Sequence, residues 1–152
     1  MKRIMHATDF SPASRPAFVR ALQEAKNHNA ELTVIHVLSP VLGFAGDGYV
    51  SPSTCAALAR SSRAWAQKKL EALLARAKGA RVRARGLLLD GVAHEQIAKA
   101  AKSKKTALLV VGTHGRTGVA RFFVGSVAGR VVATAPCPVL TVRGTSERIA
   151  HV

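Results

Sequence analysis

Glycines are concentrated between residues 110 and 132, VVGTHGRTGVARFFVGSVAGRVV, with four of them from Gly112 to Gly125. Gly125 and Ser126 stand directly before a helical pattern. The first backbone amides of a helix lack intrahelical acceptors and the helix dipole adds positive charge, so a helix N-terminus attracts anions. Glycine there lets an oxygen approach the amides without a Cβ in the way. The segment therefore predicts binding of a phosphate chain, a property that many phosphate loops share.

Several other motifs of known chemistry are excluded because each lacks a required residue. The segment HEQIA at 94–98 begins like the zinc motif H-E-x-x-H but has Ala98 in place of the second histidine. GSVAG does not have the order of a G-x-S-x-G nucleophile elbow, and GTHGRTG lacks the lysine and spacing of a Walker A loop. Cys55 and Cys137 form no CxxC pair, and Cys137 is expected to be a packing residue. No general base with an orienting partner stands out, so fast hydrolysis is not predicted.

Strands and helices alternate along the chain and must position this loop. Strands are expected at 3–8, 32–38, 82–90, 107–112 and 139–143. Helices are expected after a capping Ser14, and at 54–78, 91–103 and 126–134. This alternation predicts an α/β protein, a three-layer open sandwich in which helices cover both faces of a five-stranded parallel sheet. We expect one domain over residues 1–145 and a frayed tail at 146–152.

Two segments carry more detailed expectations. Residues 39–53 are rich in Gly, Pro and Ser and are expected to form a long loop, a candidate lid. The following helix is expected to bury an apolar side made of Leu58, Trp65, Leu70, Leu73 and Leu74. His36, inside the second strand, is interpreted as a core histidine with its hydrogen bonds satisfied.

The ligand of such a sheet binds beyond the carboxyl ends of the strands, where the connections diverge to opposite faces. Asp9 ends the first strand and Gly112 ends the fourth. The two residues therefore line one crevice if those strands are neighbours. Asp9 is interpreted as a ligand-contacting residue, with an ordinary Asx turn as the alternative.

Positive charge is the unusual feature of the composition. The chain has 23 Lys and Arg against 8 Asp and Glu, a net charge of +15. Charge is densest in RVRAR (81–85) and KSKK (102–105), with no aromatic residues interleaved. A binding module for nucleic acid or an acidic protein is therefore an alternative function, and a solvated basic surface is the simpler interpretation. The sequence shows neither a signal-like apolar region nor a membrane-spanning run, so we expect a cytoplasmic protein.

The spacing of the glycine-rich segment makes it more specific. Two residues separate Gly112 from Gly115, and nine more precede Gly125-Ser126, which gives the pattern G-x2-G-x9-G-[ST]. This pattern resembles the ATP-binding signature of the universal stress protein (UspA) family. The resemblance covers nearly the whole chain. RIMHATDFSPAS resembles the family's opening, LTVIHVL its second strand, GVAHEQIAKAA its G-x-P-x-x-x-I-x-x-A segment, and APCPVLTVR its ending.

The resemblance implies a fold, a ligand and an assembly. The fold would be of the adenine nucleotide alpha hydrolase-like type, with strand order 3-2-1-4-5. ATP would be a regulatory ligand in a stress response, with Mg²⁺ held mainly by phosphate oxygens and Asp9 as a candidate ligand. The residues placed around ATP are Ala7, Thr8, Asp9, Val37, Val111, Gly112, His114, Gly115, Gly125, Ser126 and Val127. Arg116 and Arg121 are further candidates for phosphate contact. A homodimer would form through 139–143, whose apolar edge needs covering.

Three positions depart from the family pattern. Ala7 and Ala93 stand where proline is common, and Gly129 interrupts the last helix where ATP-binding relatives often carry a larger polar residue. Gly129 either softens that helix, at a cost of up to about 1 kcal/mol, or allows close packing. An alternative on the same fold is an enzyme with slow ATP hydrolysis or autophosphorylation, with Ser126 as the candidate acceptor. A further alternative is a member whose loop closes without nucleotide.

Overall fold

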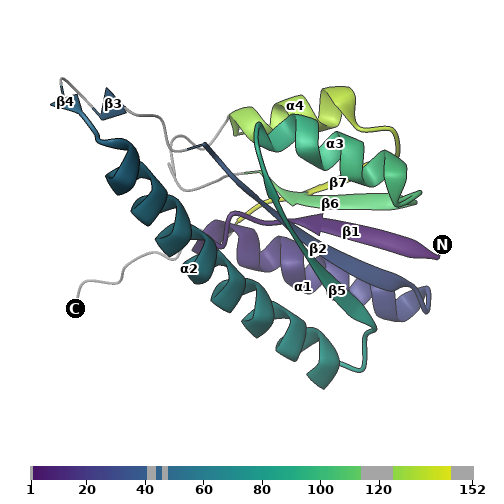
Figure 1. The fold of residues 1–152 in the computed structure, drawn as a ribbon. Coiled ribbons are helices and arrows are strands. Elements are labelled where there is room, and N and C mark those ends of the chain that lie inside the picture. Colours follow the sequence, from purple (N-terminus) through teal and green to yellow (C-terminus); the bar gives the residue numbers. More distant parts are fainter. Residues whose placement is uncertain (1, 41–43, 46–47, 114–124, 145–152) are drawn as a thin grey trace, which may run out of the picture.

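The computed structural model describes residues 2–40, 44–45, 48–113 and 125–144 (Figure 1). The five strands of its parallel sheet are β1 (Arg3–Ala7), β2 (Glu31–Leu38), β5 (Ala84–Asp90), β6 (Leu108–Gly112) and β7 (Val139–Val142). The helices are α1 (Arg15–Asn27), α2 (Pro52–Gly79), α3 (Ala93–Ser103) and α4 (Ser126–Thr134), and a 3-10 turn η1 (Pro12–Ser14) precedes α1. Two short strands, β3 (Phe44–Ala45) and β4 (Gly48–Tyr49), form a separate antiparallel pair. The expected tail, 146–152, lies outside the described residues.

The strand order of the main sheet is β5-β2-β1-β6-β7. When only the strands of this sheet are numbered along the chain, the order becomes 3-2-1-4-5, as the family resemblance implied. Helices α1 and α2 cover one face of the sheet and α3 and α4 cover the other (Figure 1). The expected fold class, a three-layer α/β sandwich with a parallel sheet, is confirmed.

The central strand β1 contributes to the core on both faces of the sheet. Its side chains alternate, so Ile4 packs with Phe18 on the side of α1 and α2, while Met5 packs with Ile97 on the side of α3 and α4. Because helices cover both faces of the sheet, Ile4, Met5 and His6 are all buried, and this part of β1 needs no polar alternation.

Two expectations for residues 39–78 were wrong. The loop expected at 39–53 contains β3 and β4, each too short to show an alternating pattern in the sequence. Leu58 and Trp65, expected in the core, are 48% and 43% exposed. The reason is that α2, with 28 residues, is longer than β2 and β5, along which it packs: its buried residues begin only at Ala66, and its first turns project with β3 and β4 away from the sheet (Figure 1). Leu70 is buried as expected.

Ser14 stands at the N-cap of α1 as expected, yet its side chain does not cap the helix. Its φ and ψ of −84° and −13° are helical, because η1 runs directly into α1 and leaves no extended residue at the junction. The Ser14 hydroxyl instead donates to the Ser11 carbonyl oxygen at 2.9 Å and lies 3.1 Å from the Thr8 hydroxyl. It therefore braces the connection that follows β1.

His6 is a fully buried ionisable residue beneath α1, with its ring 5.7 Å from that of Phe18. Its Nδ1 lies 3.1 Å from the Val110 carbonyl oxygen. Since a carbonyl only accepts, Nδ1 carries the proton. Nε2 has no hydrogen-bond partner among the described residues. Burial lowers the pKa of His6 from 6.5 to about 4, and the bond to Val110 offsets this only in part. The ring is therefore neutral at neutral pH.

Helices α1, α2 and α3 end with the same backbone turn. The residues that follow their C-caps, Asn29, Arg81 and Lys105, have positive φ angles of 47°, 59° and 51°. In each turn two amides donate back to carbonyls of the last helical turn, with N···O distances between 2.8 and 3.2 Å. Glycine is favoured at this left-handed position because a Cβ costs about 1–2 kcal/mol there. Two long cationic side chains therefore occupy positions that favour glycine.

We expect acid to destabilise the protein through His6. Below pH 6.5 the unfolded chain takes up a proton at this ring, whereas the folded chain does so only near pH 4. The free energy of unfolding therefore falls as the pH drops through this window, by about 2 kcal/mol between pH 7 and pH 5. Urea denaturation of the wild type and of His6→Leu at both pH values measures this fall in the free energy of unfolding. The variant has no ring to protonate and should not show the part that His6 contributes. An equal loss in both proteins would contradict the assignment.

The left-handed turns give a second prediction. Lys105→Gly should be more stable than Lys105→Ala by about 1 kcal/mol, because both variants lose the same charge but only alanine keeps a Cβ at positive φ. The difference between their urea midpoints, at equal m-values, measures it. Identical midpoints would mean that the turn after α3 relaxes out of the left-handed conformation.

Candidate functional site

A cavity of about 510 Å³ opens at the carboxyl ends of β1, β2 and β6, beside the N-terminus of α4. Its volume lies in the range of sites for small molecules. Nine residues expected around a ligand line it: Ala7, Thr8, Asp9, Val37, Val111, Gly112, Gly125, Ser126 and Val127. His114, Gly115, Arg116 and Arg121 lie outside the described residues. The geometry thus brings the expected residues to one place, and their contacts with a ligand stay predictions.

The cavity exists because β1 and β6 are neighbours. They pair in parallel with Ala7 opposite Val111, so Asp9 and Gly112 reach the same edge of the sheet. The chain leaves β1 toward α1 on one face, and the α4 that follows β6 lies on the other face. The connections diverge between these strands, which is where doubly wound sheets bind their ligands.

The connection after β1 is held by hydrogen bonds from its own residues. The Asp9 carboxylate accepts from the Ser11 amide at 2.9 Å, which forms the Asx turn considered as the alternative for this residue. The Thr8 hydroxyl accepts from the Phe10 amide at 3.0 Å. Between these bonds Phe10 has a φ of 62°, which is unusual for a bulky residue. Such backbone strain is characteristic of functional sites and ligand clamps.

Aromatic rings support this strained residue. The Phe10 ring lies 4.4 Å from the His36 ring and meets Trp65 of α2 edge to face at 5.5 Å. His36 Nδ1 lies 2.7 Å from the Thr8 carbonyl oxygen, so its interpretation as a satisfied core histidine is confirmed. His36 and Trp65 also line the cavity. Sequence reasoning missed both because a histidine within an apolar strand and a tryptophan on a helical stripe each indicate core.

The N-terminus of α4 forms the opposite wall. Gly125 is its N-cap, and no side chain of the described residues caps this helix. The φ and ψ of Gly125, −52° and 150°, are open to any residue, so its glycine matters for small size and not for conformational freedom. Its amide donates to the Thr113 carbonyl oxygen at 2.6 Å. The amides of Ser126 and Val127, in the first turn of the helix, are of the kind that binds anions.

The lining has a polar part and an apolar part. The polar part consists of Asp9 and of hydroxyl groups from several elements, with Ser14, Ser39 and Ser62 added to the expected residues. Ile35, Ile97 and Val131 extend the apolar part between the sheet and helices α3 and α4. Among the described lining residues Asp9 is the only carboxylate, and there is no Lys or Arg. Backbone amides are therefore the main described groups with positive partial charge.

The structure shows the surroundings of Ala93 and Gly129, two of the positions that depart from the family pattern. Ala93 is the first residue of α3 and lines the cavity, so alanine fills a first-turn position where proline is merely well tolerated. A Cβ at Gly129 would meet no described atom within 4 Å, so the described part of the chain shows no close packing at Gly129. The other expectation, that Gly129 softens α4 through its low helix propensity, stays a prediction.

Cys137 is partly buried against the core beside α4, and burial raises the pKa of its thiol. A raised pKa leaves little of the reactive thiolate, so the packing role expected for Cys137 is confirmed. Within the described ranges, no helix combines the length and the apolar character that a membrane span requires.

Comparison with known proteins identifies the family. The model of the Universal stress protein family matches residues 1–143. A universal stress protein of Thermus aquaticus is 37% identical over 142 residues, which cover 93% of this chain and 98% of the relative. The structure of UspA from Lactobacillus plantarum superposes with a TM-score of 0.81 at 25% identity, covering 93% of this chain and 97% of that one.

A universal stress protein solved in complex with cAMP has a TM-score of 0.70 at 25% identity, over 95% of this chain and 98% of that one. Nucleotide binding is thus found among the structural neighbours of this fold. Since the family model spans residues 1–143, nearly the whole sequence, this chain belongs to the universal stress protein family.

Proposed function

We propose that this protein binds ATP in the cavity as a regulatory ligand of a stress response. One observation carries the proposal: a helix N-terminus that no described side chain caps opens into a cavity lined by nine of the residues that the family resemblance places around ATP. The triphosphate would lie beside Gly125, against the amides of Ser126 and Val127. The relative in complex with cAMP supports an adenine nucleotide as the class of ligand.

The two parts of the lining fit the two ends of a nucleotide. The apolar part, with Val37, Val111 and Ile97, suits an adenine ring, whose edge would meet backbone groups at the end of β2. Thr8 and Asp9 would face the ribose or a phosphate-bound Mg²⁺. With one described carboxylate in the lining, such a Mg²⁺ would depend on phosphate oxygens and water, as this ion commonly does.

The chemistry of the described lining favours a bound ligand over rapid turnover. His36 Nδ1 donates to the Thr8 carbonyl oxygen, and the Asp9 carboxylate accepts from the Ser11 amide, so both groups are held by the chain itself. Slow hydrolysis or autophosphorylation at Ser126 is the enzymatic alternative. It would require that Asp9→Ala or His114→Ala abolishes turnover while ATP still binds.

The assembly and location proposed from the sequence complete this function. Strand β7 is an edge of the sheet, so pairing of residues 139–143 between two copies would cover it. We propose such a homodimer in the cytoplasm, which size-exclusion chromatography with light scattering and cell fractionation would examine.

We expect native mass spectrometry to detect ATP on the protein in millimolar Mg²⁺-ATP, and Gly125→Val to weaken its binding at least tenfold. The valine side chain would occupy the space through which phosphate oxygens approach the amides, and each charge-assisted hydrogen bond lost costs about 1.5–3 kcal/mol. Gly125→Val should fold, because its φ and ψ suit valine.

Gly129→Val is the matched control, since it places the same side chain on the same helix, at a position where a Cβ meets no described atom within 4 Å. It should bind ATP like the wild type. An equal loss in both variants would indicate damage to α4 and not to phosphate contacts. If no nucleotide binds at millimolar ATP, the proposal is rejected.

A further inference from the structure

The end of the sheet where the parallel strands begin, opposite the cavity, is strongly basic. We call residues 2–3, 78–85 and 102–105 the basic pole. These 14 residues contain nine of the chain's 23 Lys and Arg and no Asp or Glu. They lie just before or at the start of β1, β5 and β6, and the amino ends of these parallel strands meet at one end of the sheet. The fold therefore joins the two basic runs RVRAR and KSKK, which are about twenty residues apart in the sequence, into one surface.

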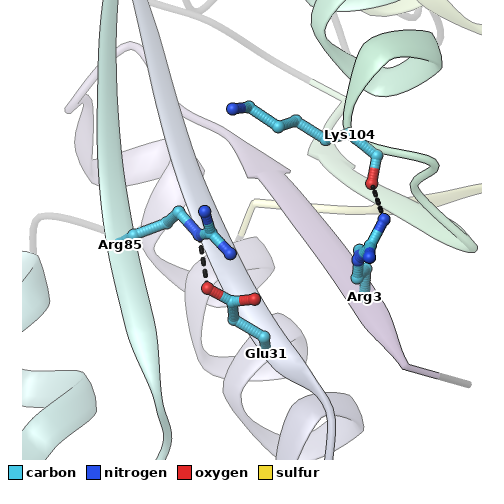
Figure 2. A network of polar contacts seen from close by, with 4 residues as sticks. All are labelled: Arg3, Glu31, Arg85 and Lys104. Carbon is cyan, nitrogen blue, oxygen red and sulfur yellow. Dashed lines mark hydrogen bonds and ion pairs between the residues drawn. The ribbon is translucent and has the colours of Figure 1, made fainter.

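Hydrogen bonds confirm that the segments are adjacent. The Glu31 amide donates to the Lys2 carbonyl oxygen at 3.0 Å, and the Leu32 amide to the Arg83 carbonyl oxygen at 2.9 Å. Figure 2 shows the row across the strands: Arg85 pairs with Glu31, and Arg3 donates to the Lys104 carbonyl oxygen at 2.9 Å. Three segments distant in sequence thus present their cations side by side.

Little negative charge opposes them. The guanidinium of Arg85 holds the pKa of Glu31 below its usual value through their hydrogen bond, so this carboxylate is ionised and already paired. Of the nine cations, Arg85 alone forms an ion pair with a carboxylate within the described part of the chain. All but Lys104 are exposed. The pole is therefore a dense and largely unneutralised positive surface.

Arg81 and Lys105 carry positive charge at positions where the backbone conformation favours glycine. Both have positive φ, where glycine is favoured. Cations near a helix C-terminus complement its dipole, which is the simplest explanation for them. However, Lys78 already fills that role in the last turn of α2, as Lys102 does in α3. The helix dipole alone therefore does not account for a second cation in a strained position after each helix.

We propose that the basic pole binds double-stranded nucleic acid through its phosphate backbone, without reading the bases. No aromatic residue lies within the pole, so it offers no platform for stacking the bases of a single strand. None of its residues is an exposed large apolar side chain, so it lacks the apolar centre of a protein interface. Four neighbouring strands span about 14 Å, over which a duplex carries about eight phosphate charges.

The test measures fluorescence anisotropy of a labelled 20-base-pair DNA duplex of mixed sequence, with full-length protein and no nucleotide added. Arg81→Gly and Lys105→Gly should each weaken binding severalfold at 0.1 M salt. If each removes one phosphate contact, the loss of affinity at 0.1 M salt exceeds the loss at 1 M salt by up to about eightfold. Each should also lower the slope of log K against log salt by about one. Because glycine suits both turns, neither variant should have a lower melting temperature than the corresponding alanine variant.

Two matched controls separate the pole from general effects. Asn29→Gly makes the same backbone change after α1 without removing charge, and Arg60→Gln removes an exposed charge of α2 away from the pole. Both should bind like the wild type. If Arg60→Gln weakens binding as much as Lys105→Gly, the net charge of the protein is responsible and the proposal fails. It also fails if polyglutamate, an acidic polypeptide, binds while the duplex does not at 0.05 M salt.

Discussion

Parallel pairing of β1 with β6 is the contact on which the rest of the structure depends. It aligns Ala7 with Val111 and brings together the ends of two strands whose following helices lie on opposite faces. It also fixes which side chains enter each half of the core. A shift by one residue would exchange Ile4 and His6 with Met5 and Ala7, because neighbouring side chains of a strand point to opposite faces. Such a shift would lose the core and the cavity together.

The two walls of the cavity are built in different ways. The β1 connection is fixed by backbone and side-chain contacts: the Thr8 amide donates to the Ile35 carbonyl oxygen, the Thr8 carbonyl accepts from His36, and the Phe10 ring packs against two other rings. No described side chain caps the α4 wall, which presents the amides of the first helical turn. The β1 connection therefore sets the shape of the cavity, and the N-terminus of α4 supplies the attraction for an anion. A site of this kind needs no cationic side chain among its described lining residues.

Local signals in the sequence predicted the alternating strands and helices, whereas the strand order and most of the nine lining residues came from the family resemblance. Buried parallel strands form short apolar runs, and a strand end followed by glycine marks the cavity edge. Trp65, β3 and β4 could not be predicted, because nothing local shows where α2 passes beyond the sheet. Ser14 was misjudged because its capping role depends on whether η1 continues into α1. The meeting of the two basic runs depends on strand order and so appears only in three dimensions.

Trp65 gives the molecule a spectroscopic property. It is the only tryptophan of the chain, it lines the cavity, and it packs edge to face on the strained Phe10. Lys69 lies 5.9 Å from its ring on the next turn of α2. The indole emission of the whole protein therefore comes from one point, where α2 meets the β1 connection. Any rearrangement of this junction changes the colour or intensity of that emission, so the natural protein needs no added label to report on it.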